Sequence, residues 1–184
     1  MEAAISELPD IQCSIRWRPF FLAGQSMLRN YPDGKLKDEK DPTKRTSMRL
    51  LEAGMKAGIN FTGKTDRYPN TTLAHTLMSY TLEKDGAEIQ SKLAEIVFRH
   101  YFTDGKYPNH QHLLEAAMEA GVSDPTAALA YAAVESNQKP ILDEARSYSS
   151  GGVSGVPFFF INEKPSGSGA MSSSSFKELL EKEL

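Results

Sequence analysis

The feature that most constrains the fold of this chain is a change of hydrophobic period near residue 150. From residue 41 to residue 149, apolar residues recur at the three- and four-residue spacing of helices. Gly151 and Gly152 interrupt this pattern, and residues 156–161 then form a continuous apolar run with three adjacent phenylalanines. A run this short is typical of a strand buried on both faces. The chain is therefore expected to place a long helical block before a buried strand.

A second strand is predicted near the N-terminus, at residues 11–18. Ile11, Cys13, Ile15 and Trp17 alternate there with polar residues, which indicates one buried and one solvated face. Cys13 falls on the apolar face and is expected to be a buried small hydrophobe. Arg16 and Arg18 fall on the polar face, where a solvated edge is preferred over a ligand-binding role. Residues 2–8 are expected to be the last turns of a helix.

Six helices are expected in the helical block, after a solvated loop at residues 31–42. Capping residues, apolar stripes and terminal glycines set their bounds. The first helix starts at Asp41-Pro42 and carries Met48, Leu51 and Met55, and the second starts at an Asn70 cap and ends near Gly86. The third, fourth and sixth helices are expected at about 87–102, 111–120 and 139–148, and the fifth starts at Asp124-Pro125. Residues 164–170 are expected to pair with the strand at 156–161, and a last helix carries Phe176, Leu179 and Leu180.

Composition limits the classes of protein that fit. The 184 residues suit one domain, with 40% hydrophobic and 24% charged residues. A net charge of -3 does not indicate a nucleic-acid binder, and no segment reaches the roughly 18 apolar residues of a membrane span. The first nine residues lack the pattern of a secretory signal, so a cytoplasmic location is expected. His100, His110 and His112 lack metal-ligand spacing, so no metal site is predicted, and residues 110–112 are expected to cap the fourth helix facing solvent.

Four short motifs in order resemble FrnE-type members of the DsbA superfamily over residues 2–184. They are Arg16-Trp17-Arg18-Pro19-Phe20; Asn70-Thr71 with Ala74-His75; Val153-Ser154-Gly155-Val156-Pro157-Phe158-Phe159; and Ser168-Gly169-Ala170. The resemblance implies an α/β thioredoxin-like fold with an all-helical insertion. It implies a single domain over residues 1–184, with thioredoxin parts at about 1–30 and 150–184 and the insertion at about 41–149.

The resemblance also implies a substrate loop. In this fold the proline matching Pro157 is usually cis, and it turns the backbone of the residue matching Val156 outward to pair with an extended thiol peptide. A substrate-binding site is therefore expected at Ser154, Gly155, Val156 and Pro157, with His75 and Asn70 from the second helix. The expected partners are a thiol peptide or glutathione, and glutathione is the one cofactor that the resemblance allows.

The sequence departs from the family pattern at the catalytic end. Members place a reactive cysteine or serine between the first strand and first helix, but this strand and the cysteine-x-x-cysteine turn have no counterpart here. Disulfide exchange needs an attacking thiolate and a resolving thiol, whereas Cys13 is the single cysteine. No catalytic residue is assigned, and the chain is expected to be inactive by itself.

The missing first strand would leave the strands at 11–17 and 156–161 without a common neighbour. Three explanations are open: an upstream segment encodes the strand, the two remaining strands pair directly, or another chain supplies it, as in a dimer through the exposed strand edge. The first is preferred.

Three functions follow from these observations. The leading hypothesis is a thiol-disulfide oxidoreductase of the DsbA type that lacks its nucleophile. The second is a glutathione-dependent transferase or isomerase of the kappa or hydroxychromene-carboxylate type, which uses serine in some members. The third is a non-catalytic peptide-binding or chaperone-like module.

Overall fold

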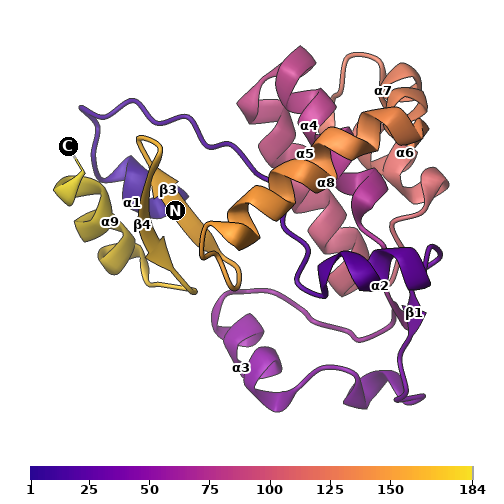
Figure 1. Cartoon of the computed structure of the whole chain (residues 1–184). Coiled ribbons are helices and arrows are strands. Elements are labelled where there is room, and N and C mark those ends of the chain that lie inside the picture. The colour runs from indigo at the N-terminus through magenta and orange to yellow at the C-terminus, as the bar shows by residue number, and fades with distance from the viewer. Residues whose placement is uncertain (184) are drawn as a thin grey trace. The chain divides into compact units, whose positions relative to one another are not determined.

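Four helices pack against one another to form the main core of the computed structural model, which describes residues 1–183 (Figure 1). They are α4 (Thr72–Asp85), α5 (Ala87–Arg99), α6 (His110–Ala120) and α7 (Pro125–Ala133). Helix α4 contacts α5 and α7, and α6 contacts the same two helices. The buried side chains between them alternate leucine with alanine, and the small residues let the helix axes approach closely. This core belongs to one of two units, Ile15–Ala145; the other comprises Met1–Ser14 and Arg146–Leu184.

Local capping explains where these helices begin and end. The Asp124 carboxylate accepts a hydrogen bond from the Ala127 N–H at 2.9 Å, and Pro125 occupies the first turn, as predicted. Asn109 caps α6 by accepting from the His112 N–H, so the prediction that residues 110–112 form this cap was wrong. His110 is exposed, as expected, but His112 is half-buried because its ring contacts the Tyr107 carbonyl.

A buried glutamine attaches the N-terminal end of this unit to the helical core. Gln90 on α5 accepts a hydrogen bond from the Trp17 N–H at 2.9 Å and donates one to the Trp17 carbonyl at 2.9 Å. Its amide also donates to the Met78 carbonyl on α4 at 3.2 Å. The Trp17 indole packs edge-on against Phe98 and donates to the Ser91 hydroxyl. One fully buried side chain therefore supplies the pairing that a neighbouring strand usually provides.

The predicted strand at residues 11–18 is consequently wrong: this segment forms no strand. Ile11, Ile15 and Trp17 are half-buried while their polar neighbours are exposed, so the alternation correctly indicated three of the four side chains expected to face inward. Cys13 is exposed, which contradicts its predicted burial. A strand needs a ladder partner, and none of residues 1–183 provides one here.

Several other elements differ from the sequence prediction. The segment at 31–42, expected as loop, contains β1 (Lys35–Leu36), which pairs antiparallel with β2 (Arg67–Tyr68). Helix α2 (Gly24–Asn30) was not predicted. Asp41 caps a short 3-10 helix, η1 (Pro42–Lys44), and the stripe at Met48 belongs to a separate helix, α3 (Met48–Lys56). The third predicted helix ends in a π-helical turn, η2 (His100–Asp104), and α8 (Glu135–Ser150) begins earlier than expected.

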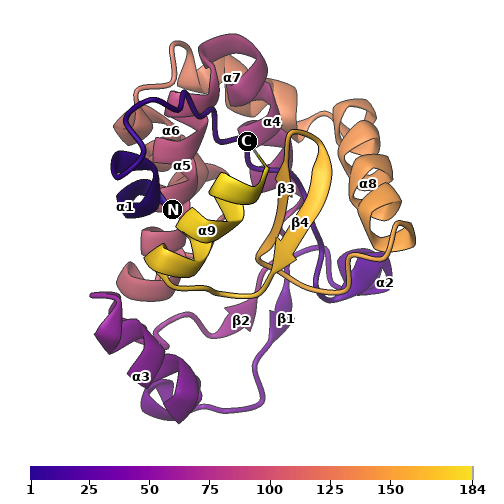
Figure 2. The same ribbon diagram turned by 90° about the vertical axis from the view of Figure 1, so that its left-hand side faces the viewer.

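The other unit contains a β-hairpin packed on two helices (Figure 2). Strands β3 (Phe158–Ile161) and β4 (Lys164–Ser168) pair antiparallel, and α1 (Glu2–Ser6) contacts α9 (Ser173–Lys182). Phe159 and Ile161 on β3 pack against the buried Ala4, Phe176 and Leu180. The predicted pairing of the two strands and the last helix are confirmed, and Ser172 caps this helix by accepting a hydrogen bond from the Ser175 N–H.

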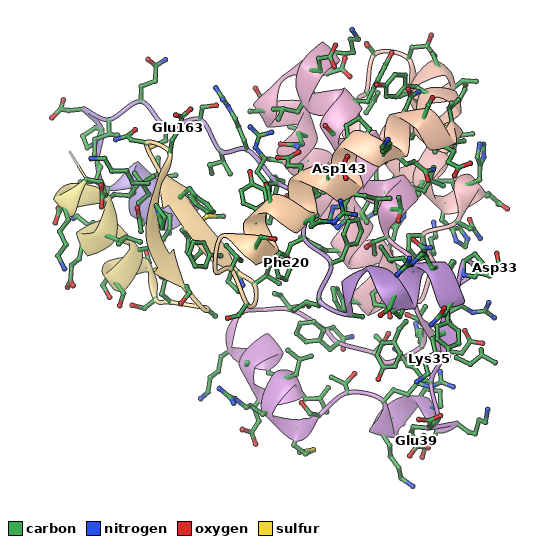
Figure 3. All side chains as sticks on the ribbon, in the orientation of Figure 1. Phe20, Asp33, Lys35, Glu39, Asp143 and Glu163 are labelled. Carbon is green, nitrogen blue, oxygen red and sulfur yellow. The ribbon has the colours of Figure 1, made fainter. Side chains whose placement is uncertain are left out.

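The hairpin turns at Asn162 and Glu163, which both have positive φ (Figure 3). Two such residues form the tight turn that matches the twist of paired strands. Pro165 pairs with Phe160 in β4, and a register shift follows between Phe159 and Phe160. The prediction that the apolar strand is buried on both faces is wrong, because Phe160 is 42% exposed and the helices cover one face.

Replacing Gln90 with leucine should detach Trp17 from the core. The change leaves the Trp17 N–H and two carbonyls without their partner, and each buried unpaired group costs roughly 1–3 kcal/mol. We expect a loss of about 3 kcal/mol in the free energy of unfolding, measured by urea denaturation. The emission of Trp17, the single tryptophan, should shift to the red in the native state. Ser91→Ala removes one indole bond and should cost less than about 1 kcal/mol; equal losses in both variants would contradict this account.

Candidate functional site: the Val156–Pro157 loop

The loop that precedes β3 begins at a well-defined helix end. Gly152 has a φ of +95°, a conformation that favours glycine, and it ends α8. The Val153 N–H then donates back to the Tyr148 carbonyl at 3.1 Å, and the Val153 side chain is buried. These contacts fix the direction in which Ser154, Gly155, Val156 and Pro157 leave the helix.

Val156 lies exposed in this loop, next to a proline that is tied to the hairpin. The bond between Val156 and Pro157 is cis, as the family resemblance implies. The Pro157 carbonyl accepts a hydrogen bond from the Gly169 N–H at 2.8 Å and is thereby tied to the end of β4. Val156 is 50% exposed, and among residues 1–183 no group hydrogen-bonds to its N–H or carbonyl. A methyl group added at Gly155 would meet no heavy atom within 4 Å beyond its chain neighbours, so the approach to the loop is open.

The strand that follows has one unpaired edge. β3 pairs with β4 alone among the strands in residues 1–183. Pro157 faces β4, and successive residues of a strand direct their backbone groups to opposite edges, so Phe158 and Phe160 direct theirs to the free edge. Val156 and this edge together form a row of unpaired donors and acceptors.

An aromatic cluster lies on the face of β3 that the helices leave uncovered. The rings of Phe158 and Phe160 are 5.1 Å apart, and Tyr148 from α8 lies 5.6 Å from Phe160. Sequence reasoning treated the phenylalanines as core residues and missed this cluster. The alternation of side chains along a strand could have indicated this cluster, because it places Phe158 and Phe160 on the face opposite Phe159.

His75 belongs to the Ile15–Ala145 unit and is held as a neutral ring. The Phe20 carbonyl accepts a hydrogen bond from the ring (Phe20 is labelled in Figure 3), and the Phe21 ring packs edge-on at 5.0 Å. Burial lowers the pKa of His75 to about 4, and the Phe20 carbonyl offsets only part of this effect. His75 is therefore suited to donate a hydrogen bond, not to carry a charge, near neutral pH.

Asn70 lies in the same unit and uses its side chain to begin α4. Its carbonyl oxygen accepts from the Thr72 N–H at 3.1 Å and from the Thr72 hydroxyl at 2.8 Å. Its amide donates to the Leu28 carbonyl of α2 at 3.2 Å. The predicted contact of Asn70 with the start of α4 is present, but the N-cap position is Thr71, one residue later. The loop lies in one unit while Asn70 and His75 lie in the other, so a common site stays a prediction.

The described residues 1–183 contain no group of three histidine, cysteine, aspartate or glutamate side chains placed to hold a metal ion. Over the same residues, none of the helices combines the length and apolar character needed to cross a membrane.

The chain belongs to the family of DSBA-like thioredoxin domains, whose family description matches residues 1–181. Its fold is the α/β, DsbA-like thioredoxin fold with a helical insertion, and the family is of the thiol-disulfide oxidoreductase type. A search of curated proteins found no match. The family assignment confirms the resemblance at the level of the DsbA superfamily.

His75 should make stability depend on pH. Its pKa of about 4 in the folded state lies below the ordinary 6.5, so the unfolded chain binds more protons between these values. The free energy of unfolding should therefore fall as pH drops from about 6.5 to 4, with about 3 kcal/mol from this residue.

His75→Gln keeps a donor for the Phe20 carbonyl and should remove that part of the slope, measured by urea denaturation from pH 7 to 4. His110→Gln replaces an exposed histidine and should leave the slope unchanged. Burial lowers the pKa of His100 too. The pH dependence of the free energy of unfolding is therefore compared between each variant and the parent protein. An unchanged slope in His75→Gln would show that the ring is not enclosed as described.

Proposed function

We propose that this chain binds an extended, cysteine-containing polypeptide as an added strand along Val156 and the free edge of β3, without turning over disulfides by itself. The observation that carries the proposal is that Val156 is half exposed and that its backbone N–H and carbonyl have no hydrogen-bond partner among residues 1–183. A peptide strand that pairs with Val156 and Phe158 would satisfy these groups by main-chain hydrogen bonds, which do not depend on the peptide sequence.

The absence of turnover follows from the thiol count. Exchange proceeds when a thiolate attacks one sulfur of a disulfide and releases the other sulfur as a thiolate. Cys13 is exposed and is the single cysteine of the 184 residues, so any mixed disulfide it forms must be resolved by a thiol from another molecule. The family's two-thiol cycle therefore cannot run within these residues.

The length of the edge favours a peptide longer than glutathione. The backbone groups directed to the free edge belong to Val156, Phe158 and Phe160 and so extend along most of β3 (Phe158–Ile161). A strand advances about 3.3 Å per residue, so a tripeptide thiol covers only part of this row. The aromatic face at Phe158 and Phe160 adds apolar surface for alternate side chains of a longer strand. Glutathione-dependent chemistry is the weaker candidate for this reason.

A second copy of the chain is the competing occupant of the same edge. Its own β3 could pair with β3 in an antiparallel, two-fold arrangement. Dimerisation would then suppress peptide binding as the protein concentration rises, which separates the two occupants.

Removing the N–H of Val156 should weaken peptide binding. Val156→Pro has no backbone donor, whereas Val156→Thr keeps the donor and nearly the same side-chain shape. Binding is measured by fluorescence anisotropy of a labelled twelve-residue extended peptide containing one cysteine. We expect about tenfold weaker binding for Val156→Pro, equivalent to one lost hydrogen bond, and little change for Val156→Thr. Circular dichroism checks that both variants fold; equal affinity of the two would reject the added-strand geometry.

The chain should not accelerate the reduction of insulin by dithiothreitol. The turbidity of released B chain is followed with and without protein, and Cys13→Ser is run in parallel. We expect all three curves to coincide, because no pair of thiols is present to cycle. Acceleration that disappears in Cys13→Ser would mean that this cysteine is an exchange centre and would overturn the inactivity proposal.

A further inference from the structure

Helix α3 (Met48–Lys56) carries large apolar side chains that are open to solvent. Met48 is 70% exposed and Met55 is 75% exposed, and the spacing of seven residues puts both on one face of the helix. Leu50 and the following Ile59 are exposed as well. Figures 1 and 2 both show α3 outside the α4–α7 bundle of its unit. We define Met48 and Met55 as the α3 patch; Leu50 lies about 200° round the helix from Met48, and Ile59 follows the end of the helix.

The α3 patch rests on a fixed base. Gly54 is buried on the opposite side of the helix, where an added methyl group would come within 2.5 Å of the Phe61 ring. Phe61 in turn packs edge-on against Phe102 of η2 at 5.4 Å. The apolar side chains of the patch are therefore presented on a helix that is anchored through its other face.

Arg45 secures the two loops that flank α3. Its guanidinium donates to the carbonyls of Glu39 and Lys40 on one loop and of Gly63 and Lys64 on the other, at 2.9 to 3.2 Å. Figure 3 shows Glu39 on the approach to η1. Ser47 caps the helix by accepting from the Leu50 N–H at 3.3 Å. The α3 patch therefore lies on a helix whose flanking loops and first turn are held by hydrogen bonds.

The charge around the patch is positive in a chain whose net charge is negative. Helix α3 carries two basic residues, Arg49 and Lys56, and one acidic residue, Glu52, whereas the whole chain carries -3. Arg49 and Lys56 lie beside the methionines on the next face of α3, and within residues 1–183 neither forms an ion pair. A partner that fits must combine apolar side chains with negative charge.

We propose that the α3 patch binds an acidic amphipathic segment of another polypeptide. Contiguous exposed apolar side chains rimmed by charge mark interaction sites, and unbranched methionine adapts to apolar partners of varied shape. Arg49 and Lys56 supply attraction and orientation for the acidic residues of the partner. The helix is nine residues long and has no aromatic side chain, which is unlike a helix that embeds in a lipid surface. This surface is separate from the Val156–Pro157 loop, and its test does not depend on that site.

The probe is a fluorescein-labelled sixteen-residue peptide of leucine and glutamate with leucine at helical spacing, followed by anisotropy. A control peptide of the same design has lysine in place of glutamate. We expect the glutamate peptide to bind at least about tenfold more tightly than the lysine peptide. Met48→Ser with Met55→Ser should weaken binding about tenfold, while Met118→Ser should not change it. Met118 is a matched control because it is 65% exposed on α6, away from this basic segment.

A charge reversal decides whether the basic residues act in recognition. Arg49→Glu with Lys56→Glu should make the lysine peptide the tighter ligand, and circular dichroism confirms that the variants fold. Equal loss in Met118→Ser, no binding by the parent protein, or an unchanged preference after charge reversal would each overturn the proposal. A last experiment measures whether the protein sediments with vesicles of phosphatidylglycerol. Binding to these vesicles but not to the glutamate peptide would identify a lipid surface as the ligand and reject the polypeptide partner.

Discussion

The three hydrogen bonds of the Gln90 side chain hold the larger unit together at the point where the chain enters it. The amide joins the backbone of Trp17 to α5 and, through Met78, to α4. Because the amide is fully buried, the bonds face no competition from water, and the same burial makes the loss of any partner costly. Trp17 then packs on the core formed by α4 to α7, so the direction of the chain toward α2 follows from a single side chain.

Elements with local signals could be predicted from sequence. Asp124-Pro125, Asn70 and Ser172 each cap a helix by a side chain that acts within three residues, and Asn162 lies in the tight turn that joins β3 and β4. Residues 11–18 show what such signals omit. The period of two correctly indicated that Ile11, Ile15 and Trp17 are half-buried but was wrong for the exposed Cys13. It also cannot reveal that a glutamine more than seventy positions away supplies the backbone partner. The β1–β2 pair was missed for the same reason, since each strand has only two residues and the partners are distant in sequence.

The candidate site was partly accessible to sequence reasoning. The residues of the loop came from the family resemblance, and the structure adds that Val156 is exposed and that its backbone has no partner among the residues described. The burial of β3 was overestimated because a continuous apolar run does not report how many layers cover a strand. The stripe at Met48 and Met55 illustrates the same limit, since helical spacing identifies a shared face but not whether another element covers it.

The proline in β4 leaves β3 as the edge of the hairpin that is better able to pair with an added strand. Pro165 has no N–H, and the strand around it is irregular, so an incoming chain would find an interrupted row of donors on the β4 side. β3 has no proline within its four residues and can accept a partner along its length. Growth by strand addition is therefore expected from the β3 side of the hairpin and not from the β4 side. A phenylalanine-rich edge that could otherwise seed fibrils in both directions is in this way limited to one direction of growth.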